Sequence, residues 1–272
     1  MTRGTPPGPG AAGPAARPAH RVVLVTGAAS GLGRAVAELM AGQGWAVAAL
    51  DREEAAPGGT ALHLTADVRD PAAVRDAVAR TAAELGGIHA VAGCAGIFRN
   101  DLTPLHLLTD DAWAAHLDVN VTGAFHVVRA ALPYLIETQG AIALVASVAS
   151  RYPQPGGAAY AVSKAGVASL ARAVALEYGP RGVRANAVSP GYMDTPMAAP
   201  LMSRPHLRAG IEHGLPLRRA AAPEEVAPVI AFLLSDAGRY VTGEEVTVDG
   251  AGALTGYTSG DDLDRMWRRA PQ

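Results

Sequence analysis

The chain has 272 residues, of which 49% are hydrophobic and 18% are charged, and its formal net charge is −2. This length and apolar content suit one large α/β domain, and the near-neutral charge with dispersed arginines argues against nucleic acid as a partner. The lone Cys94 excludes an internal disulfide and a cysteine-based metal cluster, and we predict no metal site. Because no uninterrupted apolar run approaches bilayer length, we expect no membrane association.

Residues 1–19 are rich in Pro, Gly and Ala and lack the apolar core of a signal peptide. We therefore expect 1–19 to be a disordered tail on a soluble, cytoplasmic protein. The globular domain is predicted at 20–255, and 256–272 is predicted to be a C-terminal tail. Residues 195–216, which are rich in Pro, Met and Arg, are predicted to form a mobile lid on the domain.

The first element after the tail is a short apolar run at 21–26, which predicts a buried strand. It leads directly into a glycine-rich loop and then a helix that carries Val36, Leu39 and Met40. In such a unit, backbone N–H groups and the helix N-terminus bind a phosphate, and glycines allow tight turns and close approach. The predicted phosphate-binding residues are Gly27, Ser30, Gly31, Leu32 and Gly33.

The second predicted strand, at 46–50, ends in Asp51 and Arg52. An acid about 20 residues after the glycine-rich loop is suitably placed to bind the ribose hydroxyls of a dinucleotide. Its carboxylate would repel the 2′-phosphate of NADP, and Arg52 alone is not expected to overcome that repulsion, so NAD is the predicted cofactor. The alternative role for Asp51 is a helix cap or a solvated loop acid.

The rest of the chain continues the alternation of strands and helices. Seven strands separated by helices predict one doubly wound parallel sheet in a single domain of the α/β class. A long helix from 109 places Asn120 near its apolar stripe, where a buried amide must be hydrogen-bonded and could be purely structural. The remaining predicted strands are 61–65, 88–92, 141–146, 183–189 and 245–248, and the remaining predicted helices are 71–85, 158–178 and 224–234.

The candidate catalytic residues lie between the strand at 141–146 and the first turns of the next helix. Ser147 directly follows the strand, and Tyr160 and Lys164 share one face of the helix at i and i+4. A lysine ammonium beside a phenol favours the phenolate, so we expect the pKa of Tyr160 to fall from about 10 towards neutrality. The alternative is a solvated surface pair. Against it, Lys164 is the only lysine among 23 lysines and arginines, which indicates a site that needs a compact amine.

Taken together, these motifs resemble the short-chain dehydrogenase/reductase superfamily across 21–254. The resemblance implies a Rossmann-type, NAD(P)-dependent oxidoreductase, usually a homotetramer or homodimer built on two long helices. It rests on Thr26-Gly-x-x-x-Gly31-x-Gly33, Asn120, Ser147, Tyr160-x-x-x-Lys164 and Asn186-Ala-Val-Ser-Pro190-Gly191, in this order.

The same resemblance implies a role for each matched residue. Tyr160 would be the general acid and base, and Ser147 would orient the substrate oxygen. Lys164 would hold the nicotinamide ribose and lower the tyrosine pKa, while Asn120 would support a water that links Lys164 to solvent. Besides the glycine-rich loop, Asp51 and Arg52, the implied cofactor contacts are Asp67 at the adenine, Val68, Cys94, Gly96, Tyr160, Lys164, Pro190, Gly191, the Met193 backbone, and Thr195 at the carboxamide.

Two positions depart from the family pattern. The family's Asn-Asn-Ala-Gly after the fourth strand is Gly93-Cys94-Ala95-Gly96 here, and His89 stands where an acid often precedes that strand. The missing asparagine side chains put the local bracing of the strand in doubt, although backbone contacts to a cofactor could persist at Cys94. We expect Cys94 to be a small filler rather than a redox group, and His89 to be a surface or turn residue rather than a ligand.

The expected reaction is hydride transfer between a secondary alcohol or ketone and the nicotinamide, with the Tyr160 phenolate taking the hydroxyl proton during oxidation. Two alternatives are a catalytically silent NAD-binding or scaffold protein, and a sugar-nucleotide epimerase or dehydratase. The intact proton-transfer residues argue against the first, and the short region after Pro190 argues against the second. Candidate substrate contacts are Met193, Met197, Leu201 and Met202 in an apolar lid, and Arg99, Arg151 and Gln154 near the mouth.

Overall fold

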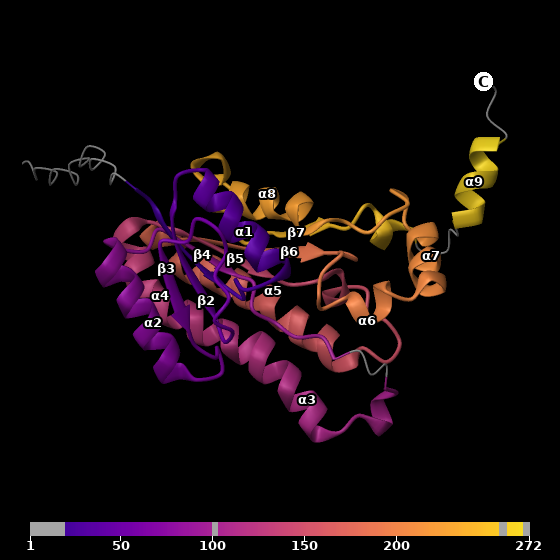
Figure 1. Ribbon diagram of the computed structural model, residues 1–272, viewed down its shortest axis with the longest axis horizontal. Coiled ribbons are helices and arrows are strands. Elements are labelled where there is room, and N and C mark those ends of the chain that lie inside the picture. The colour runs from indigo at the N-terminus through magenta and orange to yellow at the C-terminus, as the bar shows by residue number, and fades with distance from the viewer. Residues whose placement is uncertain (1–19, 100–102, 256–259, 269–272) are drawn as a thin grey trace, which may run out of the picture.

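A computed structural model of the chain describes residues 20–99, 103–255 and 260–268 (Figure 1). The predicted tail at 1–19 lies outside the described residues. Within them, the strands form one seven-stranded sheet in the order β3-β2-β1-β4-β5-β6-β7, and every neighbouring pair is parallel. The predicted doubly wound parallel sheet is therefore confirmed.

The strands begin and end within two residues of the predicted positions, because short apolar runs mark strands that are buried on both faces. The order of the strands reverses between β1 and β4, and such a reversal opens a crevice at the carboxyl ends of a parallel sheet. The strands are β1 Val22–Thr26, β2 Ala46–Asp51, β3 Leu62–Thr65, β4 Ala90–Gly93, β5 Ala141–Val145, β6 Arg184–Pro190 and β7 Glu245–Val248.

Helices cover both faces of this sheet (Figure 1). On one face, α1 (Gly31–Gly42) and α8 (Pro223–Leu234) pack side by side over a core of Val, Ala and Leu side chains. On the other face lie α2 (Pro71–Leu85), α4 (Gly123–Thr138) and α5 (Ala158–Tyr178). Each helix buries one apolar stripe, which is why the alternating pattern of the sequence was sufficient to predict them.

The long helix predicted from 109 is not uniform. It begins as α3 (Asp110–His116), passes through a π-helical segment, η2 (Leu117–Thr122), and continues as α4. Thr109 caps it by accepting a hydrogen bond from the backbone N–H of Ala112. Local π-helical turns are rare and often lie at functional sites, and this one contains Asn120.

By length and composition, the helical stretch 110–138 is apolar enough to cross a bilayer, although it holds no uninterrupted apolar run of that length. In the folded chain, 44% of its most apolar window is buried inside the protein. Val127, Val128, Ala131 and Leu135 pack in the core against the sheet. The stretch therefore serves as a core helix of this domain.

The region predicted to be a lid contains two short helices, α6 (Ala199–Met202) and α7 (Pro205–Gly214). Part of the predicted C-terminal tail is a further helix, α9 (Gly260–Arg268), which lies beside α7 (Figure 1). His213 of α7 contacts Asp261 of α9 at 3.0 Å, and Arg218, just after the predicted lid, forms an ion pair with Asp264 at 2.5 Å. Single helical turns complete the fold at η1 Leu105–Leu107, η3 Val148–Ser150, η4 Gly179–Arg181, η5 Asp236–Gly238 and η6 Gly252–Leu254.

Candidate active site

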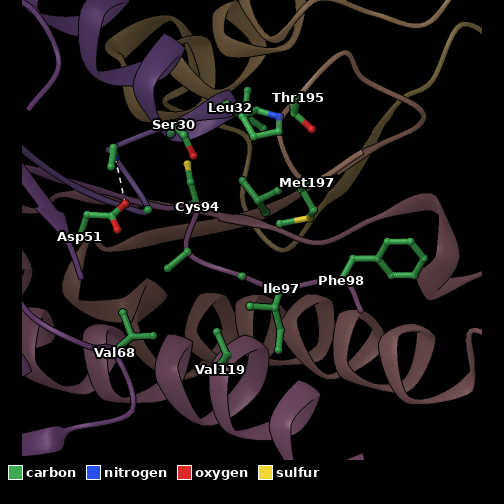
Figure 2. Close-up of a pocket in the computed structure, with 18 of the residues that line it drawn as sticks. Ser30, Leu32, Asp51, Val68, Cys94, Ile97, Phe98, Val119, Thr195 and Met197 are labelled. Atoms are coloured by element: carbon green, nitrogen blue, oxygen red, sulfur yellow. Dashed lines mark hydrogen bonds between the residues drawn. The ribbon is translucent and has the colours of Figure 1, made fainter. Parts of the chain in front are cut away.

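A cavity of about 910 Å³ opens at the carboxyl ends of the central strands. Figure 2 shows its lining from Asp51 and Val68 at one end to Phe98 at the other. Apart from Asn120, every predicted catalytic and cofactor-binding residue lines this cavity. These are Gly27, Ser30, Gly31, Leu32, Gly33, Asp51, Arg52, Asp67, Val68, Cys94, Gly96, Ser147, Tyr160, Lys164, Pro190, Gly191, Met193 and Thr195.

The glycine-rich loop has a shape that only glycine permits. Gly27 and Gly31 have positive φ angles of 67° and 53°. A Cβ on Gly33 would lie 2.1 Å from the carbonyl oxygen of Gly27, so no larger residue fits there. The helix α1 begins at Gly31 without an acidic residue in its first turn and without a side-chain cap from Ser30. Its N-terminal N–H groups therefore face the cavity, and this arrangement fits the pyrophosphate of a dinucleotide.

Asp51 ties the end of β2 to this loop. One carboxylate oxygen accepts a hydrogen bond from the backbone N–H of Ala29 at 2.9 Å (dashed in Figure 2), and the other accepts from the backbone N–H of Glu53 at 3.2 Å. The neighbouring Arg52 forms an ion pair with Glu53 at 3.3 Å. Asp51 therefore braces the glycine-rich loop, which is neither the helix cap nor the solvated acid that we considered, and its carboxylate also lines the cavity.

Asp67 and Val68 lie at the same end of the cavity. The guanidinium of Arg69 binds the Asp67 carboxylate at 2.6 Å and 2.9 Å, and this hydrogen bonding lowers the pKa of Asp67. Arg69 thereby neutralises part of the negative charge at this end. The carboxylate that the family resemblance places at the adenine is thus already engaged within the chain.

Ser147, Tyr160 and Lys164 converge at the ends of β5 and α5. The Lys164 Nζ donates a hydrogen bond to the carbonyl of Val145 at 2.8 Å and lies 5.8 Å from the centre of the Tyr160 ring. Lys164 is only 5% exposed, so the alternative of a solvated surface pair is wrong. Ser147 is also buried, and its hydroxyl accepts from the backbone N–H of Ala149 at 3.2 Å.

Burial dominates the electrostatics of this group. It lowers the pKa of Lys164 to about 8, because the ammonium loses its hydration. It also raises the pKa of Tyr160 above 10, and a hydrogen bond with Ser147 only partly offsets that rise. For the chain by itself, the predicted fall in the tyrosine pKa is therefore wrong. The reason is that desolvation of the phenolate dominates, and the neighbouring Lys164 does not counter it.

Asn120 lies beneath the cavity and is 1% exposed. Its Oδ1 accepts from the backbone N–H of Ile97 at 2.8 Å, and its Nδ2 donates to Ser163 Oγ at 2.8 Å and to the Ile97 carbonyl at 3.1 Å. It therefore links the long helix, the loop after β4 and α5. A Cβ on Gly96 would lie 3.1 Å from Asn120 Oδ1 and 3.2 Å from Lys164 Nζ, so these two groups crowd the same glycine.

The two departures from the family pattern have structural explanations. The Cys94 side chain is half-buried with its sulfur towards Ser30 (Figure 2). Burial raises its thiol pKa to about 12, so the reactive thiolate is disfavoured, which agrees with the predicted role as a small filler. In place of asparagine bracing, the Thr26 hydroxyl accepts from the backbone N–H of Ala95 at 3.2 Å.

His89, which we predicted to be a surface or turn residue rather than a ligand, lies half-buried in the loop directly before β4. Its Nδ1 accepts from the backbone N–H of Val22 at 3.1 Å. It thus braces the first strand through an acceptor, as an acid at this position could. Burial lowers the pKa of His89, which favours this neutral state. Among the described residues, no group of three or more His, Cys, Asp or Glu side chains could hold a metal ion.

The opposite wall comes from the end of β6. A Cβ on Gly191 would lie 2.7 Å from the Cβ of Asp249, so the wall has no room for a side chain at this position. Met193 forms an isolated β-bridge with Ala221, and Thr195 lies against Gly31 at the opening of α1. This places the predicted carboxamide contacts across the cavity from the loop after β4.

The sequence alone did not reveal the apolar end of the cavity. Ile97, Phe98 and Val119 line it together with Met197 (Figure 2). The Phe98 ring meets the Tyr160 ring edge-on, with 4.8 Å between their centres. The position of Ile97 and Phe98 in the sequence could have indicated this role, because residues that follow the carboxyl end of β4 lie at the crevice.

The predicted polar contacts near the mouth separate in the structure. Arg99 lines the cavity, and its backbone N–H donates to Nε2 of the buried His116 at 3.2 Å. Arg151 instead binds Glu245, and Gln154 donates to the Tyr192 hydroxyl. Of the predicted apolar lid, Met193 and Met197 line the cavity, whereas Met202 is buried elsewhere and Leu201 is not part of the lining.

Comparison with known proteins places this geometry in a wide family. Residues 27–252 match the protein family described as enoyl-(acyl carrier protein) reductase. A cis-4-hydroxycyclohexanecarboxylate dehydrogenase of Sinomonas cyclohexanicum is 40% identical over 251 residues, which cover 89% of this chain and 98% of that protein. A 3-oxoacyl-(acyl-carrier-protein) reductase of Thermotoga maritima is 37% identical over 242 residues, covering 85% and 96%. The ligand-free aldohexose dehydrogenase of Thermoplasma acidophilum superposes with a TM-score of 0.81 at 30% identity, covering 86% of this chain and 94% of that one.

Proposed function

Because the chain belongs to the short-chain dehydrogenase/reductase superfamily and is thereby an oxidoreductase, we propose that it is an NAD-dependent dehydrogenase that interconverts a secondary alcohol and its ketone. One observation carries this proposal. The buried Ser147 and Lys164 and the half-buried Tyr160 line the same cavity as the open N-terminus of α1. A proton-transfer group and a phosphate site in one cavity suit a nicotinamide-dependent reaction.

The chain's own residues handle the proton. The Tyr160 hydroxyl takes the proton of the substrate alcohol during oxidation and returns it during reduction. The Ser147 hydroxyl holds the same substrate oxygen, and Lys164, whose pKa is about 8, can change its protonation near neutral pH and support that exchange. When bound, the nicotinamide cofactor supplies the carbon that gives or takes the hydride.

Support for NAD over NADP comes from the charges at the ribose end. The Asp51 carboxylate lines the cavity beside the glycine-rich loop, where a 2′-phosphate would lose about 2–4 kcal/mol through repulsion and lost hydrogen bonds. Arg52 is paired with Glu53, and Arg69 is paired with Asp67. Each guanidinium already offsets a neighbouring carboxylate, so little net positive charge is available there to attract a 2′-phosphate.

The lining of the apolar end suggests the substrate class. Ile97, Phe98 and Met197 suit a hydrocarbon body next to Tyr160, and the exposed Arg99 has no ion pair among the residues that the structure describes. We therefore propose secondary alcohols with an apolar, ring-sized body and an acidic group. The similarity to a hydroxycyclohexanecarboxylate dehydrogenase supports this choice.

The two alternatives have less support. A silent NAD-binding protein does not require a buried lysine beside a tyrosine, and burying that ammonium is costly. A sugar-nucleotide enzyme needs room for a second nucleotide, whereas the region after Pro190 adds only the short helices α6 and α7 before α8.

We extend the proposal to a homodimer or homotetramer built on α4 and α5. Apolar side chains are exposed on these helices, with Phe125 at 41%, Val162 at 48% and Leu176 at 82%. A surface of this kind is typical of an interface. Sedimentation of the full chain measures the assembly directly.

The deciding experiment is Tyr160→Phe, assayed by the absorbance of NADH with a panel of cyclic secondary alcohols and ketones. We expect kcat to fall by at least about 10² while the Kd for NAD stays within about twofold, because the ring packing is kept and the proton carrier is removed. Tyr152→Phe is the matched control, since Tyr152 is 52% exposed and outside the cavity lining. A Tyr160→Phe enzyme with more than a tenth of wild-type kcat would show that another group moves the proton.

A further inference from the structure

A buried carboxylate outside the cavity binds four donors at once. Glu245 opens β7, and its side chain is 2% exposed. Its Oε1 accepts from Ser150 Oγ at 2.5 Å and Ser189 Oγ at 2.8 Å. Its Oε2 accepts from Arg172 Nη2 at 2.6 Å and Arg151 Nε at 3.1 Å. Both oxygens are therefore saturated with hydrogen bonds.

The charge of Glu245 is maintained by these partners. Burial by itself raises the pKa of Glu245, but hydrogen bonds from the two serines and the charges of the two arginines outweigh burial and leave the pKa below its ordinary value. The carboxylate is therefore ionised at neutral pH. A buried charge contributes little to stability compared with an apolar side chain, so its presence here calls for another role.

The partners of Glu245 come from the elements that carry the proposed proton-transfer group. Ser150 ends η3, the turn that begins directly after Ser147. Arg172 lies on α5, the helix of Tyr160 and Lys164. A single carboxylate thus joins the serine's turn to the tyrosine's helix.

We propose that Glu245 is a positioning residue, which holds the turn after Ser147 against α5 so that the Ser147 and Tyr160 hydroxyls meet the same substrate oxygen. This inference rests on the proposed function. Ser147 has no bond to Glu245, and its alignment depends on a turn whose other end Ser150 anchors. A displacement of about 1 Å at a reacting group can reduce the rate by about 10²-fold, so the anchor bears on kcat.

The two serines on Oε1 provide a matched pair of variants. Ser150→Ala removes the hydrogen bond from the turn itself to Glu245 and leaves only the side chain of Arg151, the residue after the turn, on the other carboxylate oxygen. Ser189→Ala removes a bond from β6 to Oε1 and leaves the turn anchored. We expect Ser150→Ala to lower kcat at least about tenfold with an unchanged KM for NAD. Ser189→Ala should keep wild-type kcat, although urea unfolding shows a similar loss of stability for both. Ser150→Thr keeps the hydroxyl and should restore kcat to within about threefold.

A double-mutant cycle tests whether Ser150 acts through Glu245. Glu245→Gln should lower kcat by itself, and combining it with Ser150→Ala should lower kcat no further than the more damaging single change. Wild-type kcat in Ser150→Ala, an equal loss in Ser189→Ala, or additive losses in the cycle would each overturn the inference. These outcomes differ from a failure of the proposed function, in which the wild-type chain turns over no alcohol or ketone with either cofactor and both proposals fall.

Discussion

Replacing Lys164 with Met should make the protein more stable at neutral pH while abolishing its activity. Burial lowers the pKa of Lys164 from 10.5 to about 8. At about 1.4 kcal/mol per pKa unit, the folded state carries a penalty of about 3 kcal/mol at pH 7 for keeping the ammonium charged. Methionine has a similar length and no charge, and losing the bond to the Val145 carbonyl costs about 1 kcal/mol. We therefore expect a net gain of about 2 kcal/mol.

The sign of the pH dependence follows from the same shift. Between pH 8 and pH 10.5 the unfolded chain holds a proton on Lys164 that the folded chain has released. The contribution of Lys164 to the wild-type stability therefore rises with pH across this window, and its penalty is complete only below about pH 8. By pH 9.5 the penalty has fallen to about 1 kcal/mol, so the advantage of Lys164→Met over wild type should shrink by about 2 kcal/mol.

Urea unfolding of both proteins at pH 7 and pH 9.5, at one fixed protein concentration, measures this difference. Burial raises the pKa of the Cys94 thiol to about 12 in the folded state, but both proteins carry this thiol, so its contribution cancels in the comparison. Arg181→Met is the control, since this exposed arginine stays charged in both states and should show no such pH dependence. If Lys164→Met is less stable than wild type at pH 7, or if its advantage is the same at both pH values, the argument from desolvation is wrong.

Three further predictions concern the cavity. Asp51→Asn can still accept the loop hydrogen bond but lacks the charge, so the kcat/KM preference for NAD over NADP should fall at least about tenfold; an unmoved ratio contradicts the assigned role. Arg99→Gln should lower kcat/KM about tenfold for a carboxylate-bearing alcohol and leave its methyl ester unaffected, whereas equal losses for both count against an acid subsite. Gly33→Ala places a Cβ 2.1 Å from the carbonyl oxygen of Gly27 and should raise the Kd for NAD at least about tenfold. Gly42→Ala on the same helix is the control, because its Cβ meets nothing within 4 Å, and it should leave the Kd unchanged.

Local sequence patterns were sufficient for the fold, the glycine-rich loop and the group of Ser147, Tyr160 and Lys164, whereas the family resemblance implied the remaining cofactor contacts. Apolar runs marked the strands because a parallel sheet covered on both faces buries every side chain of a strand. The glycines of the loop could be interpreted because positive φ angles and contacts closer than a Cβ allows leave no other residue type. The residues that follow each strand could be placed together because the carboxyl ends of parallel strands meet at one edge.

The π-helical turn at Asn120 and the apolar end around Phe98 were beyond such patterns. Asn120 occupies a helix whose apolar periodicity continues on both sides of it, so the sequence predicts an ordinary helix there. Phe98 follows a short strand in a loop without a periodic pattern, and only its contact with the Tyr160 ring shows its place.

The sequence by itself determined which elements form, in what order, and which residues gather at the ends of the strands. The reason is that hydrophobic periodicity and the backbone geometry of glycine depend on only a few neighbouring residues. Only the tertiary structure decided how charged groups behave there. The rise in the pKa of Tyr160 and the fall in that of Lys164 come from surrounding side chains that no local pattern counts. In the sequence, Glu245 resembles any acid at the start of a strand, and only the folded chain shows its hydrogen bond with Ser150, 95 positions away. Desolvation and long-range hydrogen bonds depend on what packs around a group, and packing exists only once the chain has folded.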